Sequence, residues 1–115
     1  MTTLHEGRHT GEHLLSEANG TLSRESVTVT QSGTALPPGQ VLGKITASGK
    51  FVPYNNAASN GSEVAAAILY APLEAATGDT KATVHVRHCE VVGAMLTGID
   101  APGKVDLAAL GIITR

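Results

Sequence analysis

The sequence His5-Glu6-Gly7-Arg8-His9 matches the H-E-x-x-H pattern of zinc peptidases. In those enzymes one helix places both histidines on the same face, and the glutamate activates a zinc-bound water. Two glycines, Gly7 and Gly11, each cost about 1 kcal/mol of helix stability relative to alanine, and no apolar stripe supports a helix here. We therefore interpret the motif as a chance match. Adventitious metal binding stays open for three histidines: His5, His9 and His13.

A second group of potential metal ligands consists of His85, His88 and Cys89. Side chains on a strand alternate between faces, so His85 and His88 point in opposite directions. His85 and Cys89 share a face but lie about 13 Å apart at the strand rise, which is too far for one ion. We therefore predict surface histidines beside a strand and a buried or half-buried thiol. The sequence predicts no catalytic residue, no metal site and no cofactor site, and hence no enzyme.

Short strands and tight turns are the elements that must position any functional side chain. Ser26–Thr30 alternates between polar and β-branched residues, which predicts a half-buried strand. A Pro-Pro-Gly turn and a Ser-Gly turn then separate short apolar runs, which is typical of hairpins. Further strands are expected at 41–46, 50–54, 64–70 and 83–88, with 90–96 continuing the last one after a bend.

The run at 64–70 has conflicting signals. Its alanines favour a helix, whereas its length and the stop at Pro72 favour a buried strand, and we predict the strand. A brief helix is expected at 106–111, with Asp106 as N-cap and Gly111 as C-cap. The remaining expectations are loops at 55–62 and 75–81 and an extended tail at 112–114.

The chain divides into a polar arm, residues 1–24, and a β-rich domain, residues 25–115. The arm contains three histidines and only isolated apolar residues, so it cannot bury a face of its own. We expect it to be mobile in the free protein, either as a frayed terminus or as a segment that orders on a partner. The predicted fold class is mainly β, with little helix.

Composition limits the classes of function. At 115 residues the chain is expected to form one domain with a modest core. Only 3% of residues are aromatic, so a marginal monomer would gain burial by oligomerising. A net charge of −2 argues against nucleic-acid binding, and the longest apolar run, 64–71, is too short to span a bilayer. The N-terminus lacks a secretion signal, and the single cysteine, Cys89, excludes an intrachain disulfide and fits a reducing compartment.

The stretch from Gly39 to Tyr54, with glycines at its turns, resembles the head decoration proteins of tailed phages, the lambda-type family. A glycine-led apolar strand at Gly61–Tyr70 continues the likeness, as do segments at both ends of the chain. Those segments are Gly11–Ala18, Leu22–Glu25 and Leu107–Ile113.

The resemblance implies a bent-ribbon (β-clip) fold, a homotrimer and a place in the virion. Such proteins sit on the outer surface of the mature capsid at three-fold positions, clamp the major capsid protein and stabilise the shell. Assembly in the host cytoplasm, and no nucleic acid or membrane as partner, are implied as well. The N-terminal arm would pair with capsid segments. The expected contacts are Leu14, Leu15, Ser16, Glu17, Leu22 and Ser23.

Two alternatives to a capsid-stabilising protein stay open. A small β-clip module that binds a non-viral partner or a small ligand would need a polar pocket, and the sequence offers no aromatic-lined site. A zinc peptidase built on His5–His9 is the remote third alternative. A metal assay on full-length and arm-deleted protein would separate the peptidase from the other two.

Overall fold

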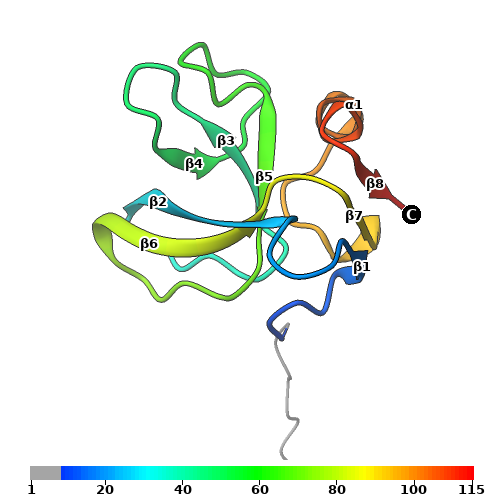
Figure 1. Cartoon of the computed structure of the whole chain (residues 1–115). Coiled ribbons are helices and arrows are strands. Elements are labelled where there is room, and N and C mark those ends of the chain that lie inside the picture. The colour runs from blue at the N-terminus through cyan, green and yellow to red at the C-terminus, as the bar shows by residue number, and fades with distance from the viewer. Residues whose placement is uncertain (1–8) are drawn as a thin grey trace, which may run out of the picture.

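The computed structural model describes residues 9–115, and this part of the chain folds mainly into β-strands (Figure 1). The predicted mainly β fold with little helix is confirmed. The strands are β1 (Leu14–Glu17), β2 (Arg24–Ser32), β3 (Val41–Lys44), β4 (Phe51–Pro53), β5 (Ala65–Leu69), β6 (Thr77–His85), β7 (Cys89–Val91) and β8 (Ile112–Thr114). A 3-10 turn, η1 (Gly93–Met95), and one helix, α1 (Ala101–Ala109), complete the elements of the described residues.

Five strands form a closed barrel in the order β2-β4-β3-β5-β6. Its longest ladder is antiparallel and joins β2 to β6 through nine register pairs, from Arg24↔His85 to Ser32↔Thr77. The barrel closes between β2 and β4 through one parallel pair, Val29↔Phe51. A single residue pair therefore closes the barrel between β2 and β4, and this junction is called the seam below. The β2–β6 side, in contrast, is paired along its whole length.

Alternating residues of the barrel strands point inward and make an aliphatic core. On β2, Val29 is fully buried and Val27 packs against the same cluster, as the sequence alternation predicted. The predicted strand at 64–70 is confirmed as β5, and its Ala67 and Leu69 lie in this core. The full cluster of buried residues is Val29, Leu36, Leu42, Phe51, Ala67, Leu69, Ala82 and Val84.

A smaller sheet in the order β1-β7-β8 lies beside the barrel, with α1 next to β8 (Figure 1). β7 runs antiparallel to β1 and parallel to β8. A second core cluster fills the space between this sheet, α1 and the barrel, with Ile68, Val91 and Leu107 fully buried. The expected tail at 112–114 is thus strand β8, and its Ile112 belongs to this core.

Three expectations about local structure are wrong. The strand expected at 90–96 is only the short β7, which ends at Val91, and Gly93–Met95 forms the 3-10 turn η1. The segment 75–81 was predicted as a loop, but most of it belongs to β6, where small and polar residues pair with β2. The ladder, rather than the strand propensity of Gly78 and Asp79, decides the structure there. The helix begins at Ala101 and not near Asp106, because Asp100 is the N-cap and Pro102 lies in the first turn.

Asp100 joins the helix cap to the core. Its Oδ1 accepts hydrogen bonds from the Gly103 backbone N–H at 2.8 Å and from the Tyr54 hydroxyl at 2.8 Å. Burial and this contact raise the pKa of Tyr54 to about 12. Asp106, the expected cap, instead accepts a hydrogen bond from the Ala65 backbone N–H at 3.1 Å and ties α1 to β5.

We predict that Asp100→Ala lowers the free energy of unfolding by about 1–2 kcal/mol, because it removes the helix cap and the acceptor of the Tyr54 hydroxyl. Asp100→Asn keeps an oxygen at the cap and should lose clearly less. Urea denaturation of both variants measures the difference. Equal losses would show that the cap oxygen does not carry the effect.

Candidate functional site: the segment that precedes the barrel

The described chain starts with a tight turn that is bonded to the barrel. The Glu12 backbone N–H donates to the His9 carbonyl at 3.0 Å, and the Gly11 N–H donates to the Tyr70 carbonyl at 2.9 Å. Gly11 has a φ of 69°, and a Cβ there would lie 2.9 Å from Cε1 of Tyr70. Glycine is thus required both by the backbone conformation and by the close approach of the tyrosine ring.

The next residues form β1, which pairs with β7 through Leu14↔Val91, Ser16↔Glu90 and Glu17↔Cys89. The register shifts between Leu14 and Ser16, so Leu15 is the extra residue of a bulge. The Ser16 hydroxyl donates to Oε2 of Glu90 at 2.8 Å on the outer face of this sheet. The bulge leaves the Leu15 side chain 55% exposed.

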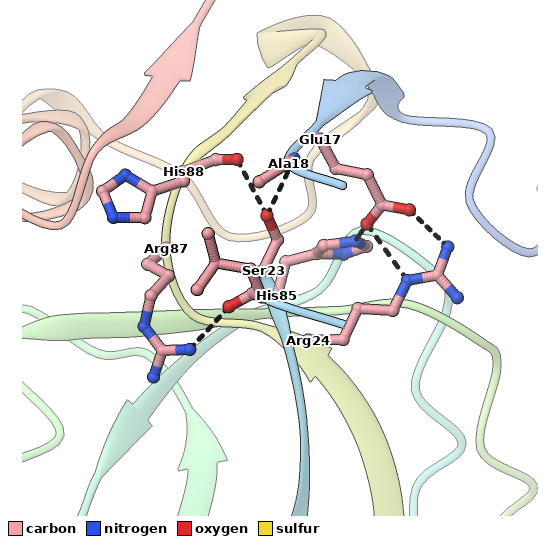
Figure 2. A network of polar contacts seen from close by, with 8 residues as sticks. Glu17, Ala18, Ser23, Arg24, His85, Arg87 and His88 are labelled. Carbon is pink, nitrogen blue, oxygen red and sulfur yellow. Dashed lines mark hydrogen bonds and ion pairs between the residues drawn. The ribbon is translucent and has the colours of Figure 1, made fainter. Parts of the chain in front are cut away.

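The loop between β1 and β2 closes on Ser23, which is fully buried. Its hydroxyl accepts from the Ala18 backbone N–H at 3.1 Å and donates to the His88 carbonyl at 2.8 Å (Figure 2). One side chain thus fixes both ends of the loop to the connection between β6 and β7. Leu22, next to it, is 55% exposed.

Glu17 is the centre of a charged network between β1 and the barrel (Figure 2). Its carboxylate receives two hydrogen bonds from the Arg24 guanidinium, from Nε at 3.0 Å and from a terminal nitrogen at 2.7 Å. Its Oε2 also lies 2.7 Å from Nε2 of His85, which is fully buried. Arg24 and His85 form the first register pair of the β2–β6 ladder, so one carboxylate binds two neighbouring strands.

Aromatic rings surround this contact. The Arg24 guanidinium lies 4.2 Å from the centroid of the Tyr70 ring, which is cation–π geometry. The His85 ring lies edge-on to Tyr70 at 5.4 Å and to His13 at 6.2 Å between centroids. His13 is 1% exposed, so the start of the described segment covers the barrel face that carries His85.

The protonation states follow from these surroundings. The hydrogen bonds from Arg24 lower the pKa of Glu17, although its partial burial opposes them. Burial lowers the pKa of His85, and the contact with Glu17 opposes this shift without reversing it. His85 is therefore neutral at pH 7 and donates its Nε2 proton to the ionised Glu17. Its buried Nδ1 has no hydrogen-bond partner within residues 9–115, which suits an unprotonated nitrogen.

A comparison of the chain with known protein families identifies the family to which it belongs. The family model described as bacteriophage lambda head decoration protein D matches residues 3–112. This chain belongs to that family. The resemblance seen in the sequence is confirmed, and the protein is a phage capsid decoration protein, a structural protein of the virion. No curated protein matches the chain significantly.

The six residues expected to bind the capsid fall into two groups in this decoration protein. Leu15, Ser16 and Leu22 are exposed. The other three point into the molecule: Leu14 packs against the second core cluster, Glu17 holds Arg24 and His85, and Ser23 closes the loop.

The expectation that the arm buries little does not hold for its described part. His13 and Ser23 are buried, and β1 is a paired strand of the smaller sheet. The sequence pattern missed this because the segment packs through polar side chains that find partners in β6 and β7, not through an apolar face. A boundary at residue 24 therefore does not mark the edge of the packed structure.

The expected histidine and cysteine positions are partly confirmed. His88 is exposed and Cys89 is 4% exposed, as predicted, and burial raises the pKa of the Cys89 thiol to about 11. The prediction of a surface His85 is wrong, because β1 and its flanking turns cover it. His85 and Cys89 also end and begin different strands, so the strand-spacing argument did not apply.

Within residues 9–115, no group of three or more His, Cys, Asp or Glu side chains is placed so that it could hold a metal ion. Most of the H-E-x-x-H match, residues 5–8, lies outside the described residues. Neither helical element of the described chain has the length and apolar character needed to cross a membrane.

Arg24 and Tyr70 were not singled out by sequence reasoning, and His85 was considered only as a potential metal ligand. Glu17 and Arg24 have opposite charges, but nothing in their spacing shows that they meet across a loop. His85 follows Val84 on β6, so its side chain lies on the face opposite the barrel core. The sequence could not show that a distant segment covers that face.

We predict that Glu17→Ala lowers the free energy of unfolding by about 1–3 kcal/mol, because it leaves Arg24 and the buried His85 without their acceptor. Glu25→Ala is the matched control, since Glu25 pairs with Arg87 on the surface, with side chains 50% and 38% exposed. The control should change stability by less than about 0.5 kcal/mol. Similar losses in the two variants, measured by urea denaturation, would contradict this role of Glu17.

We predict that acidification destabilises the protein partly through His85. Its pKa is lowered in the folded state from 6.5, so the unfolded chain binds its proton at higher pH than the folded chain does. The contribution of His85 to the free energy of unfolding is therefore complete above about pH 7, and it is lost as the pH falls below about 6.5. The lowered pKa of Glu17 adds a further loss only in the more acidic range where that carboxylate protonates.

Urea denaturation of His85→Gln between pH 7.5 and pH 5.5 checks this expectation. The variant is less stable throughout, but its stability should depend less steeply on pH than that of the wild type. His88→Asn is the matched control for removal of a histidine, since His88 is exposed and asparagine tolerates its φ of 50°. An unchanged slope in His85→Gln would remove His85 from the acid response.

Proposed function

We propose that this protein binds the outer surface of the mature phage capsid at three-fold sites as a homotrimer and stabilises the shell. The family match over residues 3–112 carries the proposal. Its physical basis is linkage: a protein that binds the assembled mature shell, and not its separated parts, shifts the equilibrium toward the shell. A trimer would engage three capsid subunits together and gain affinity through multivalency.

Trimer formation is supported by the small apolar core. Only 3% of residues are aromatic, and several large apolar side chains are exposed on the described surface. Three of them lie on α1, its C-cap and β8: Val105 is 70% exposed, Leu110 37% and Ile113 46%. Burial of such residues between copies would contribute to stability. Sedimentation equilibrium should give three times the 11.7 kDa chain mass, and a monomer at micromolar concentration would contradict the proposal.

The segment from β1 to the start of β2 is proposed to touch the capsid, with its six expected residues in two roles. Leu15, Ser16 and Leu22 would make the contact, because their side chains face solvent. Leu14, Glu17 and Ser23 would hold the segment in place through their partners in the barrel and the smaller sheet. Capsid contact by exposed leucines on a held segment costs little ordering entropy.

We predict that Leu15→Ser combined with Leu22→Ser weakens attachment to matched expanded shells by about tenfold or more, since two exposed apolar side chains are lost from the contact. Trimer mass and melting temperature should change little, because both residues are exposed. Co-sedimentation of the protein with shells measures the affinity. Deleting residues 2–20 is a poorer test, because it also removes β1 and Glu17.

Val64→Ser is the control, since Val64 is an apolar residue that is 52% exposed and lies just before β5, outside both proposed contacts. It should leave attachment as in the wild type. If the leucine double variant decorates shells as tightly as the wild type, attachment through this segment is wrong, although decoration itself would stand. If the wild type fails to bind any matched shell, the proposed function is wrong.

A further inference from the structure

The barrel is open on both sides of its single closing pair. β4 meets β2 only at Val29↔Phe51, and Figure 1 places β2 between β6 and β4. One cavity, of about 430 Å³, lies on the side of Thr30 and Pro53. The other, of about 410 Å³, lies on the side of Ser26 and is bordered by the turn that leads into β4. This second cavity is named the seam groove below.

The edge of β2 that borders the seam groove has no strand partner at Ser26 within the described residues. The Val86 N–H donates to the Ser23 carbonyl, and the Gly33 N–H donates to the Ala76 carbonyl, so odd-numbered residues of β2 bond to β6. In an antiparallel ladder the alternate residues direct their N–H and C=O groups to the opposite edge. Ser26 and Thr28 therefore face the groove, and within residues 9–115 no strand pairs with this edge at Ser26.

The seam groove is basic. Lys44, Lys50 and Lys81 reach it from β3, the turn before β4, and β6. Lys50 is paired with Asp79 at 2.7 Å, but both side chains stay more than 40% exposed. Lys44 lies 5.9 Å from the Phe51 ring centroid, and neither it nor Lys81 has a carboxylate partner among the described residues.

The acidic residues near the groove are already occupied. Glu25 lines it, but its carboxylate is bound by Arg87 at 2.7 Å. Asp79 is held by Lys50 and by the Thr30 hydroxyl at 2.9 Å. The groove therefore combines unpaired strand edge with uncompensated positive charge, and these two features select an extended segment that carries carboxylates.

We propose that the seam groove binds an extended acidic segment of the capsid subunit, which adds to β2 as a strand. The inference rests on the proposed function and names a second contact in addition to the leucine segment. Main-chain hydrogen bonds to Ser26 and Thr28 would give the pairing, and Asp or Glu side chains beside Lys44 and Lys81 would select the sequence. Four to five extended residues, about 13–17 Å, match such a short edge.

Charge variants test the selection. Lys81→Glu should weaken binding to matched expanded shells by about tenfold and make the remaining binding less sensitive to salt. Lys104→Glu is the matched control, because Lys104 is an exposed lysine on α1, away from the groove, and it should bind as the wild type does. Co-sedimentation at two salt concentrations, together with melting temperatures, measures these effects.

A backbone variant and amide exchange test the strand addition. Ser26→Pro removes an N–H that faces the groove but leaves the β2–β6 hydrogen bonds in place, and it should weaken binding by about tenfold or more. Hydrogen exchange at the Ser26 and Thr28 amides should be fast in the free protein and slow on shells. If Ser26→Pro fails to fold, the exchange rates and Lys81→Glu decide the matter.

The outcomes separate this inference from the proposed function. If the wild type decorates shells, the groove variants bind as tightly as the wild type, and the amide exchange rates do not change on shells, then only the groove contact is overturned. If Lys81→Glu binds more weakly but the Ser26 and Thr28 amides exchange equally fast on shells, the groove makes a charge contact without strand addition. This result would also overturn the inference. Amides that are already slow in the free protein would show that this edge is already covered, and they would overturn the strand addition. Absence of any wild-type binding would overturn both proposals.

Discussion

The antiparallel ladder between β2 and β6 is the interaction on which the other contacts of the described chain depend. Its first pair, Arg24 and His85, presents both partners of Glu17 side by side. Near the other end of the ladder, Asp79 forms an ion pair with Lys50, which lies on the other side of the barrel seam. The ladder therefore fixes where the preceding segment docks and where the barrel closes.

The Glu17 contact shows how a segment with few apolar residues can still pack. Removing a carboxylate from water costs free energy, and here a two-point contact with Arg24 and a hydrogen bond from neutral His85 offset that cost. Because Glu17 keeps access to solvent, the network is stabilising near neutral pH without complete desolvation of the charge. The segment is thus held by specific partners rather than by a general apolar surface.

Much of the barrel could be predicted from sequence, because alternation at 26–30 and the short apolar runs reflect inward and outward faces. The β6 strand was recognised only from Thr83 onward, since Gly78 and Asp79 have low strand propensity and are held by their partners. The helix start was missed because Asp100 and Asp106 are both plausible caps. The site needed contacts between residues more than 60 positions apart, such as Glu17 with His85, and local patterns do not contain them.

The burial of Cys89 determines how reactive the thiols of a decorated particle are. Each chain contributes one thiol, so a decorated shell carries many of them. The thiol lies in the second core cluster with a pKa of about 11, so the nucleophilic thiolate is scarce and little of it faces solvent. Disulfide cross-links between neighbouring copies through Cys89 are therefore disfavoured.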